Sequence, residues 1–192
     1  VVTDIDPTAP NGDTIDVQIN DPATDVVVTS SSVGPSTAVS PTGSTTIAGP
    51  ILTQTHFQWR NDDGSESGAT SATGGVEDTA ITGLKQESPK RLRLQVSNEG
   101  GVSSVATQYR LEYGTKVATC QNVGSWTDVG AVGGAFDMVD STNLTDGNNT
   151  TDIAVATGGV TNENTTFLTP NGGQKDTSSQ TGNITLSSTE FV

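Results

Sequence analysis

The segment from Arg91 to Gly101 reads RLRLQVSNEGG, and the segment from Tyr109 to Tyr113 reads YRLEY. In both, apolar residues alternate with polar ones, which is typical of a β-strand with one buried and one solvated face. The first run ends in Asn-Glu-Gly-Gly, residues that favour a tight turn. The two stretches therefore predict antiparallel strands joined by a Gly-Gly turn.

The same alternation recurs along the chain, and turn-forming groups such as Asn61-Asp-Asp-Gly64 separate the runs. No segment repeats apolar residues at helical spacing over three turns. This pattern predicts an all-β fold, an antiparallel β-sandwich of immunoglobulin-like or jelly-roll-like type. The expected core anchors are the apolar members of the central runs, namely Trp59, Leu92, Leu94, Tyr109 and Leu111.

RLRLQVSNEGG followed by YRLEY resembles the last hairpin of bacterial immunoglobulin-like domains. The resemblance implies that Trp59, on an earlier strand, packs across the sandwich. It implies architecture only, because the two-cysteine pattern of antibody domains is missing. The segments 56–66 and 109–115 are also similar to stretches of uncharacterised secreted bacterial surface or filament proteins, a likeness that carries no known activity.

The first 50 residues differ from the rest: they contain six of the eight prolines and no Lys or Arg. Two strand-like pieces, 13–20 and 25–33, lie among these prolines, which predicts an extended arm or edge strands. We expect an arm over residues 1–48 and an immunoglobulin-like core over 49–114. Residues 115–192 are expected to complete the sandwich or to form a second small β domain.

The net charge of −14 excludes some classes of partner. Nucleic-acid binding depends on Lys and Arg, and the same repulsion applies to anionic membranes, so neither partner is expected. The composition is typical of extracellular or cell-surface proteins. Because the chain starts at Val1 without a signal peptide, we expect a mature form or part of a longer chain.

The chain has one His and one Cys, which are too few for a zinc site built from His and Cys or for an internal disulfide framework. No metal or cofactor is therefore predicted. Cys120 is expected either to have an intermolecular partner or to be a buried small residue. The acidic run 61–66 lacks the spacing of an EF-hand loop and is interpreted as a turn. Trp126 is the one aromatic free for carbohydrate binding, although a core position is favoured.

Glycosylation is the modification that the sequence suggests. Asn-X-Ser/Thr sequons occur only in the last 50 residues, at Asn143, Asn148, Asn149, Asn164 and Asn183. Covalent glycans are therefore expected partners of this region.

The leading hypothesis is a structural subunit of an extracellular filament, a homopolymer and not an enzyme. In it, Ile15, Val17 and Ile19 on the arm enter the core of a neighbouring copy as a donor strand. Alternatively, residues 13–20 are the first strand of their own sandwich. The second functional hypothesis is an immunoglobulin-like adhesion or carbohydrate-binding module of a larger surface protein.

Overall fold

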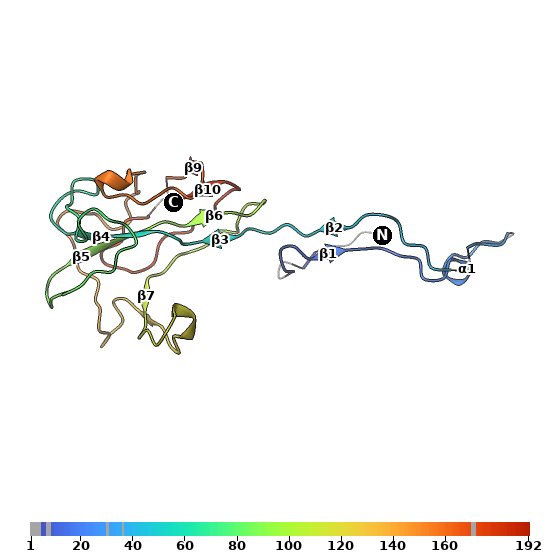
Figure 1. Ribbon diagram of the computed structural model, residues 1–192, viewed down its shortest axis with the longest axis horizontal. Coiled ribbons are helices and arrows are strands. Elements are labelled where there is room, and N and C mark those ends of the chain that lie inside the picture. Colours follow the sequence, from blue (N-terminus) through green and yellow to red (C-terminus); the bar gives the residue numbers. More distant parts are fainter. Residues whose placement is uncertain (1–4, 7–8, 30, 36, 170–171) are drawn as a thin grey trace. The chain divides into compact units, whose positions relative to one another are not determined.

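The computed structural model describes residues 5–6, 9–29, 31–35, 37–169 and 172–192 (Figure 1). Contacts divide the chain into two compact units, Val1–Gly49 and Pro50–Val192. The described elements are strands, one short helix and 3-10 turns at Cys120–Asn122 and Val155–Thr157. The sheets are small and open, and the expected all-β class is consistent with them. Pro7, one of the prolines of the predicted arm, lies outside the described residues.

The N-terminal unit is a two-stranded ribbon. Strand β1 (Thr14–Ile15) is antiparallel to β2 (Thr45–Thr46), and Ile19 and Val39 exchange two backbone hydrogen bonds of 2.9 Å. Helix α1 (Pro22–Asp25) lies between the two strands in sequence.

The start of α1 explains why the strand expected over 25–33 does not form. The Asp21 side chain accepts a hydrogen bond from the backbone N–H of Ala23, and Pro22 occupies the first helical turn. Both residues favour a helix start, because an N-cap carboxylate satisfies a free N–H and Pro has none to lose. Helix α1 occupies Asp25, and the remaining described residues of the range 25–33 form no strand, so the prediction of a strand there is wrong.

The second unit contains a four-stranded sheet with the order β3-β6-β10-β9. Its strands are β3 (Leu52–Thr53), β6 (Ser97–Asn98), β10 (Glu190–Phe191) and β9 (Thr166–Phe167). Strand β10 is antiparallel to β6 but parallel to β9. The sheet thus joins segments from the two ends of this unit.

Two further pairs complete the second unit: β4 (Phe57–Asn61) with β5 (Lys90–Leu94), and β7 (Glu112–Tyr113) with β8 (Thr127–Asp128). The predicted hairpin across Gly100-Gly101 is wrong, because its two arms take other partners. Strand β5 pairs with β4, while residues 107–111 lie beside residues 179–184 through the bridges Thr107–Ile184 and Arg110–Gln180.

The apolar core is small. Among the described residues it consists of Ala69, Ile153, Val160, Ile184, Leu186 and Phe191. The rings of Phe167 and Phe191 pack with their centroids 5.5 Å apart. Polar side chains share this interior, because Gln58, Gln95, Ser97 and Asn98 are almost fully buried.

The alternation along β4 is present, but its phase is opposite to the prediction. Gln58 and Arg60 are buried, whereas Phe57 and Trp59 are half-buried. On β5, Leu92 is half-buried and Leu94 is 39% exposed.

The prediction that these residues are core anchors is therefore wrong, because none of them is fully buried. Tyr109 and Leu111 are half-buried like Trp59 and Leu92. The physical reason is that Arg60 finds a set of carbonyl acceptors inside the unit, which turns the polar face of β4 inward.

Asn98 is the polar centre of this interior. Its amide nitrogen donates to the carbonyls of Val102 (2.8 Å) and Leu186 (3.0 Å). Its amide oxygen accepts from the N–H groups of Ile51 (3.1 Å) and Gly100 (3.0 Å). Two donors and two acceptors are all that an Asn side chain offers, so every one is used.

We predict that Asn98→Ala strongly destabilises the protein. It leaves the N–H groups of Ile51 and Gly100 without their acceptor, at about 1–3 kcal/mol each, and it removes one of the two donors to the carbonyl of Leu186. Urea unfolding measures the loss, and Asn148→Ala, at an exposed position, is the matched control. Equal unfolding midpoints for Asn98→Ala and the wild type would contradict the assignment of Asn98 as the centre.

Candidate assembly surface

The N-terminal ribbon exposes nearly all of its aliphatic side chains. Ile15, Val17 and Ile19 are 42%, 66% and 41% exposed. Ile5, Val26, Val27, Val28 and Val39 are also exposed, and Pro22 is the one buried residue among those described in this unit. An isolated two-stranded ribbon with no core is marginally stable in water. This surface therefore has the physical character of an element that is stabilised by a partner.

Residues 13–20 are paired within their own unit. Gly12 donates to the carbonyl of Ile47 and Ile47 donates to that of Asp13, while Ile19 pairs with Val39. Ile15, Val17 and Ile19 alternate along the strand, so their side chains share one face of the ribbon. The three residues predicted to act together are all exposed, and their role as a donor strand stays a prediction.

The β4–β5 ribbon presents a second incompletely covered apolar face. The register opposes Phe57 to Leu94 and Trp59 to Leu92, so these four side chains share one face. The other face carries Gln58, Arg60, Arg91 and Arg93. The residues expected to be core anchors on β4 and β5 thus form a half-covered apolar surface, defined here as the β4–β5 face.

The acidic turn 61–66 is tied to basic strands and not arranged as a cation loop. Asp62 accepts from Arg91 Nε and from Ser141 Oγ, both at 2.8 Å. Burial alone would raise the pKa of Asp62, but these hydrogen bonds outweigh it and hold the pKa below its usual range. Glu66 likewise pairs with Arg93 at 3.0 Å. Hydrogen bonds and ion pairs from the turn therefore hold the arginine side chains on the polar face of β5.

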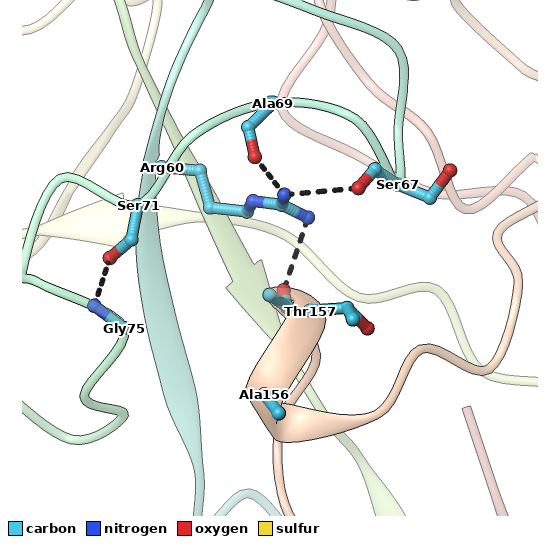
Figure 2. Close-up of a pocket in the computed structure, with 8 residues that line it drawn as sticks. Arg60, Ser67, Ala69, Ser71, Gly75, Ala156 and Thr157 are labelled. Atoms are coloured by element: carbon cyan, nitrogen blue, oxygen red, sulfur yellow. Dashed lines mark hydrogen bonds between the residues drawn. The ribbon is translucent and has the colours of Figure 1, made fainter.

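Arg60 lines a cavity of about 300 Å³ together with Ser67, Ser71, Thr157 and Gly158 (Figure 2). Its guanidinium donates to the carbonyls of Glu66, Ser67, Ala69 and Gly158, leaving Nε without a partner. Burial lowers the pKa of Arg60.

Gly158 permits this arrangement. Its φ is +100°, and a Cβ at this position would lie 2.2 Å from Arg60 Cζ. Among the described lining residues there are hydroxyls but no imidazole, thiol or carboxylate to activate one. We therefore interpret the role of Arg60 as structural, because its guanidinium hydrogen-bonds the backbone carbonyls around the cavity.

The structure separates the five sequons into two groups. The side-chain amide of Asn143 donates to the carbonyl of Asp62, and that of Asn164 donates to Ser97 Oγ and to the carbonyl of Asn98. Asn143 is exposed, as are Asn148, Asn149 and Asn183, but for the last three no hydrogen bond from the side-chain amide is found among the described residues. Because a glycan attaches to the amide nitrogen, the second group is the accessible one. Sequence spacing carries no signal for this distinction.

Trp126 and Cys120, for which the sequence analysis left a surface and a buried position as alternatives, both lie at the surface. Trp126 is 48% exposed, so the expected core position is wrong. Cys120 is exposed in the 3-10 turn Cys120–Asn122, and the buried alternative is wrong as well. The nearby rings of Tyr113 and Phe136 pack edge to face with centroids 5.0 Å apart.

No protein family, curated protein or solved structure matches the chain. Among the described residues, no helix has the length and apolar character needed to cross a bilayer. Interpretation of the surface therefore depends on the chemistry of its own residues.

Asp146 forms an ion pair with Lys175. Its Oδ2 lies 2.6 Å from Lys175 Nζ, and its Oδ1 accepts from the N–H groups of Asp176 and Thr177. The hydrogen bond from Lys175 is the main reason that the pKa of Asp146 lies far below its usual range. The pair joins the loop around residue 146 to the loop around residue 175.

We predict that the contribution of this pair depends on pH. A carboxylate with a lowered pKa in the folded state stabilises the fold above about pH 4, and the effect fades as pH falls through the folded pKa. Asp146→Asn should therefore lower the urea midpoint at pH 7, and by less at pH 2.5, which lies below the unfolded pKa but above the folded one. Asp137→Asn, an exposed acid without an ion pair among the described residues, is the control. A deficit of equal size at both values of pH would contradict the assignment.

Proposed function

We propose that the protein is a structural subunit of an extracellular filament or surface assembly and not an enzyme. In this assembly the N-terminal ribbon of one copy docks on the β4–β5 face of the next. The observation that carries the proposal is the presence of two apolar surfaces in one chain, the exposed Ile15–Val17–Ile19 face and the half-covered β4–β5 face. The partners are copies of the chain, with glycans as a second, covalent partner.

The two surfaces match in chemistry, because each presents apolar side chains at alternate positions of a ribbon. Two such faces pack against one another as the sheets of a sandwich do. Full burial of an aliphatic side chain is worth about 1.5–3 kcal/mol, and the exposed part of these three supplies roughly half of that each. The association must offset roughly 4–15 kcal/mol of lost motional freedom, so further contacts are also needed.

Charge repulsion is smallest for the same contact. The N-terminal unit holds six Asp and no Lys or Arg, whereas residues 60–116 contain seven of the eight basic residues. The ribbon would thus meet the least acidic part of the chain. Donor and acceptor are different surfaces, so the contact is head-to-tail and propagates as an open filament. In this proposal the neighbour's ribbon completes an immunoglobulin-like sandwich that a single copy leaves open.

The test uses full-length chains with three serine substitutions. Ile15→Ser, Val17→Ser and Ile19→Ser together should abolish filaments in negative-stain images and leave monomers in sedimentation velocity. Val26→Ser, Val27→Ser and Val28→Ser remove three other exposed aliphatics of the same unit, and filaments should persist. Filaments of normal length from the first variant would overturn the proposal.

An acceptor variant completes the test. Leu94→Ser should also block assembly, whereas Leu84→Ser, at a similarly exposed leucine, should not. The donor-defective and acceptor-defective chains should form a dimer when they are mixed, because each retains the surface that the other lacks. Failure to form this mixed dimer would contradict the pairing of these two surfaces.

The adhesion alternative rests on a separate observation, the exposure of Trp126 beside the Tyr113–Phe136 pair. Exposed aromatic rings stack on sugars through their apolar faces. If the protein is a carbohydrate-binding module, wild-type monomers should be retained on a polysaccharide affinity gel and Trp126→Ala should not. Equal mobility of the two proteins on every polysaccharide would dismiss this alternative, whatever the outcome for filaments.

A further inference from the structure

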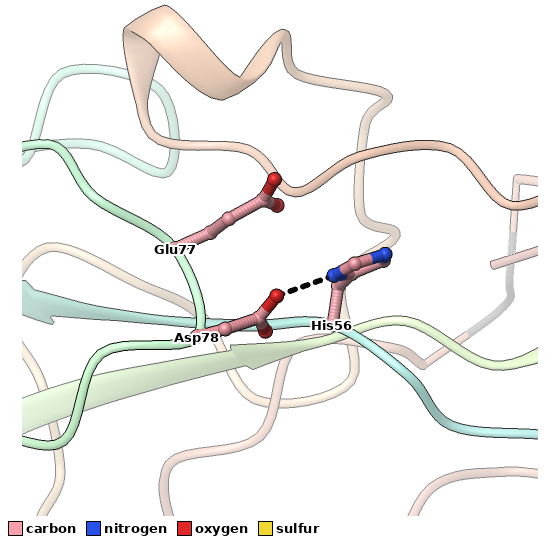
Figure 3. A group of neighbouring side chains, drawn as sticks. All are labelled: His56, Glu77 and Asp78. Atoms are coloured by element: carbon pink, nitrogen blue, oxygen red, sulfur yellow. Dashed lines mark hydrogen bonds and ion pairs between the residues drawn. The ribbon is translucent and has the colours of Figure 1, made fainter.

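His56, the single histidine of the chain, lies beside the carboxylates of Glu77 and Asp78 (Figure 3), and the carboxylate of Glu163 is its third acidic neighbour. Its Nδ1 is 2.5 Å from Asp78 Oδ2, and its Nε2 is 2.5 Å from Glu163 Oε1. One imidazole nitrogen and one oxygen from each of Glu77 and Asp78 lie within 4.8 Å of one another. Residues from three distant segments thus converge on one imidazole.

Each of these carboxylate-bearing residues is held by the surrounding backbone or side chains. Glu77 accepts from the N–H (2.7 Å) and Oγ1 (2.5 Å) of Thr161. Asp78 Oδ1 accepts from the N–H of Phe57 at 2.9 Å. The N–H of Glu163 donates to the buried Gln95 side chain. The donor atoms are therefore oriented before any ligand arrives.

The cluster is short of positive charge. Among the described residues, neither Glu77 nor Asp78 nor Glu163 pairs with a Lys or Arg, and His56 supplies at most one positive charge. Three carboxylates and one imidazole thus form a site whose charge a divalent cation would balance.

We propose that His56 Nδ1, Glu77 and Asp78 bind a divalent transition-metal ion, with Zn²⁺ the best fit to the donor set. Zn²⁺ accepts both imidazole and carboxylate ligands at about 2.0–2.2 Å, so the three donors must close in slightly and Asp78 must move off Nδ1. Ca²⁺ and Mg²⁺ prefer oxygen ligands alone, and the imidazole disfavours them. A water molecule takes the fourth position.

Glu163 provides the independent observation that points to a metal. A histidine that ligates a metal almost always donates its other ring N–H to a carboxylate or carbonyl, which fixes the ring and its tautomer. Glu163 lies on Nε2, opposite the nitrogen that faces Asp78. Glu163 is thus a positioning residue, and the bound ion links the start of β4 to the loop at residues 77–78.

The test is a calorimetric titration with ZnCl₂ at pH 7.5 in the Cys120→Ser background, which removes the exposed thiol. One ion per chain should bind. His56→Gln and Glu77→Gln should each weaken binding by more than about 100-fold, and Glu163→Gln by about 10–100-fold, the usual effect of losing an outer partner. Asp137→Asn is the matched control and should bind as tightly as the parent.

Nuclear magnetic resonance gives a second readout, because one histidine yields one set of imidazole signals. Zn²⁺ should shift the Nδ1 resonance and leave Nε2 protonated, and Glu163→Gln should increase exchange of that proton with water. Circular dichroism of the metal-free variants shows whether each is folded. An unchanged imidazole spectrum in excess Zn²⁺, or equal affinities for the parent and Glu77→Gln, would overturn the proposal.

Discussion

The second unit depends on the hydrogen bonds of one buried side chain, that of Asn98. Its amide joins the segment before β3, the turn at residues 100–102 and the backbone of Leu186. The carbonyl of Asn98 also accepts from the amide of Asn164. With 31% hydrophobic residues and strands of two to five residues, the apolar core alone cannot specify these long-range contacts. Directional bonds do so, because each buried group left unpaired costs free energy.

Local patterns in the sequence account for part of this fold. Period-two alternation and turn residues correctly predict that Trp59, Leu92 and Leu94 lie on strands, and that long helices are absent from the described part of the chain. They do not predict pairing or burial. Gln58 and Arg60 face inward because Arg60 reaches carbonyls that include the distant Gly158, and no pattern within one strand reports such a partner. Similarly, residues 107–111 lie beside residues 179–184 and not across the Gly-Gly turn.

The candidate surfaces were predictable to different degrees. The shared face of Ile15, Val17 and Ile19 follows from alternation alone, since no other element is needed to place them. The exposure of Trp126 and the engagement of Asn164 depend on loops far away in sequence. His56, Glu77, Asp78 and Glu163 have no motif spacing, because their positions are set by three loops and by hydrogen bonds from Phe57 and Thr161.

The proposed assembly face and the proposed metal site meet at the first residue of β4. Phe57 contributes its ring to the β4–β5 face, and its N–H holds the Asp78 carboxylate that contacts His56. Neutralising the carboxylates around His56 would fix the start of β4 and so order the apolar face beside it, without adding any contact to the ribbon. The coupling is reciprocal by thermodynamic linkage, so an ion that orders the acceptor face favours docking, and a docked ribbon favours ion binding by the same factor. Loss of the ion would therefore loosen the acceptor surface, and loss of the ribbon would weaken the affinity for the ion.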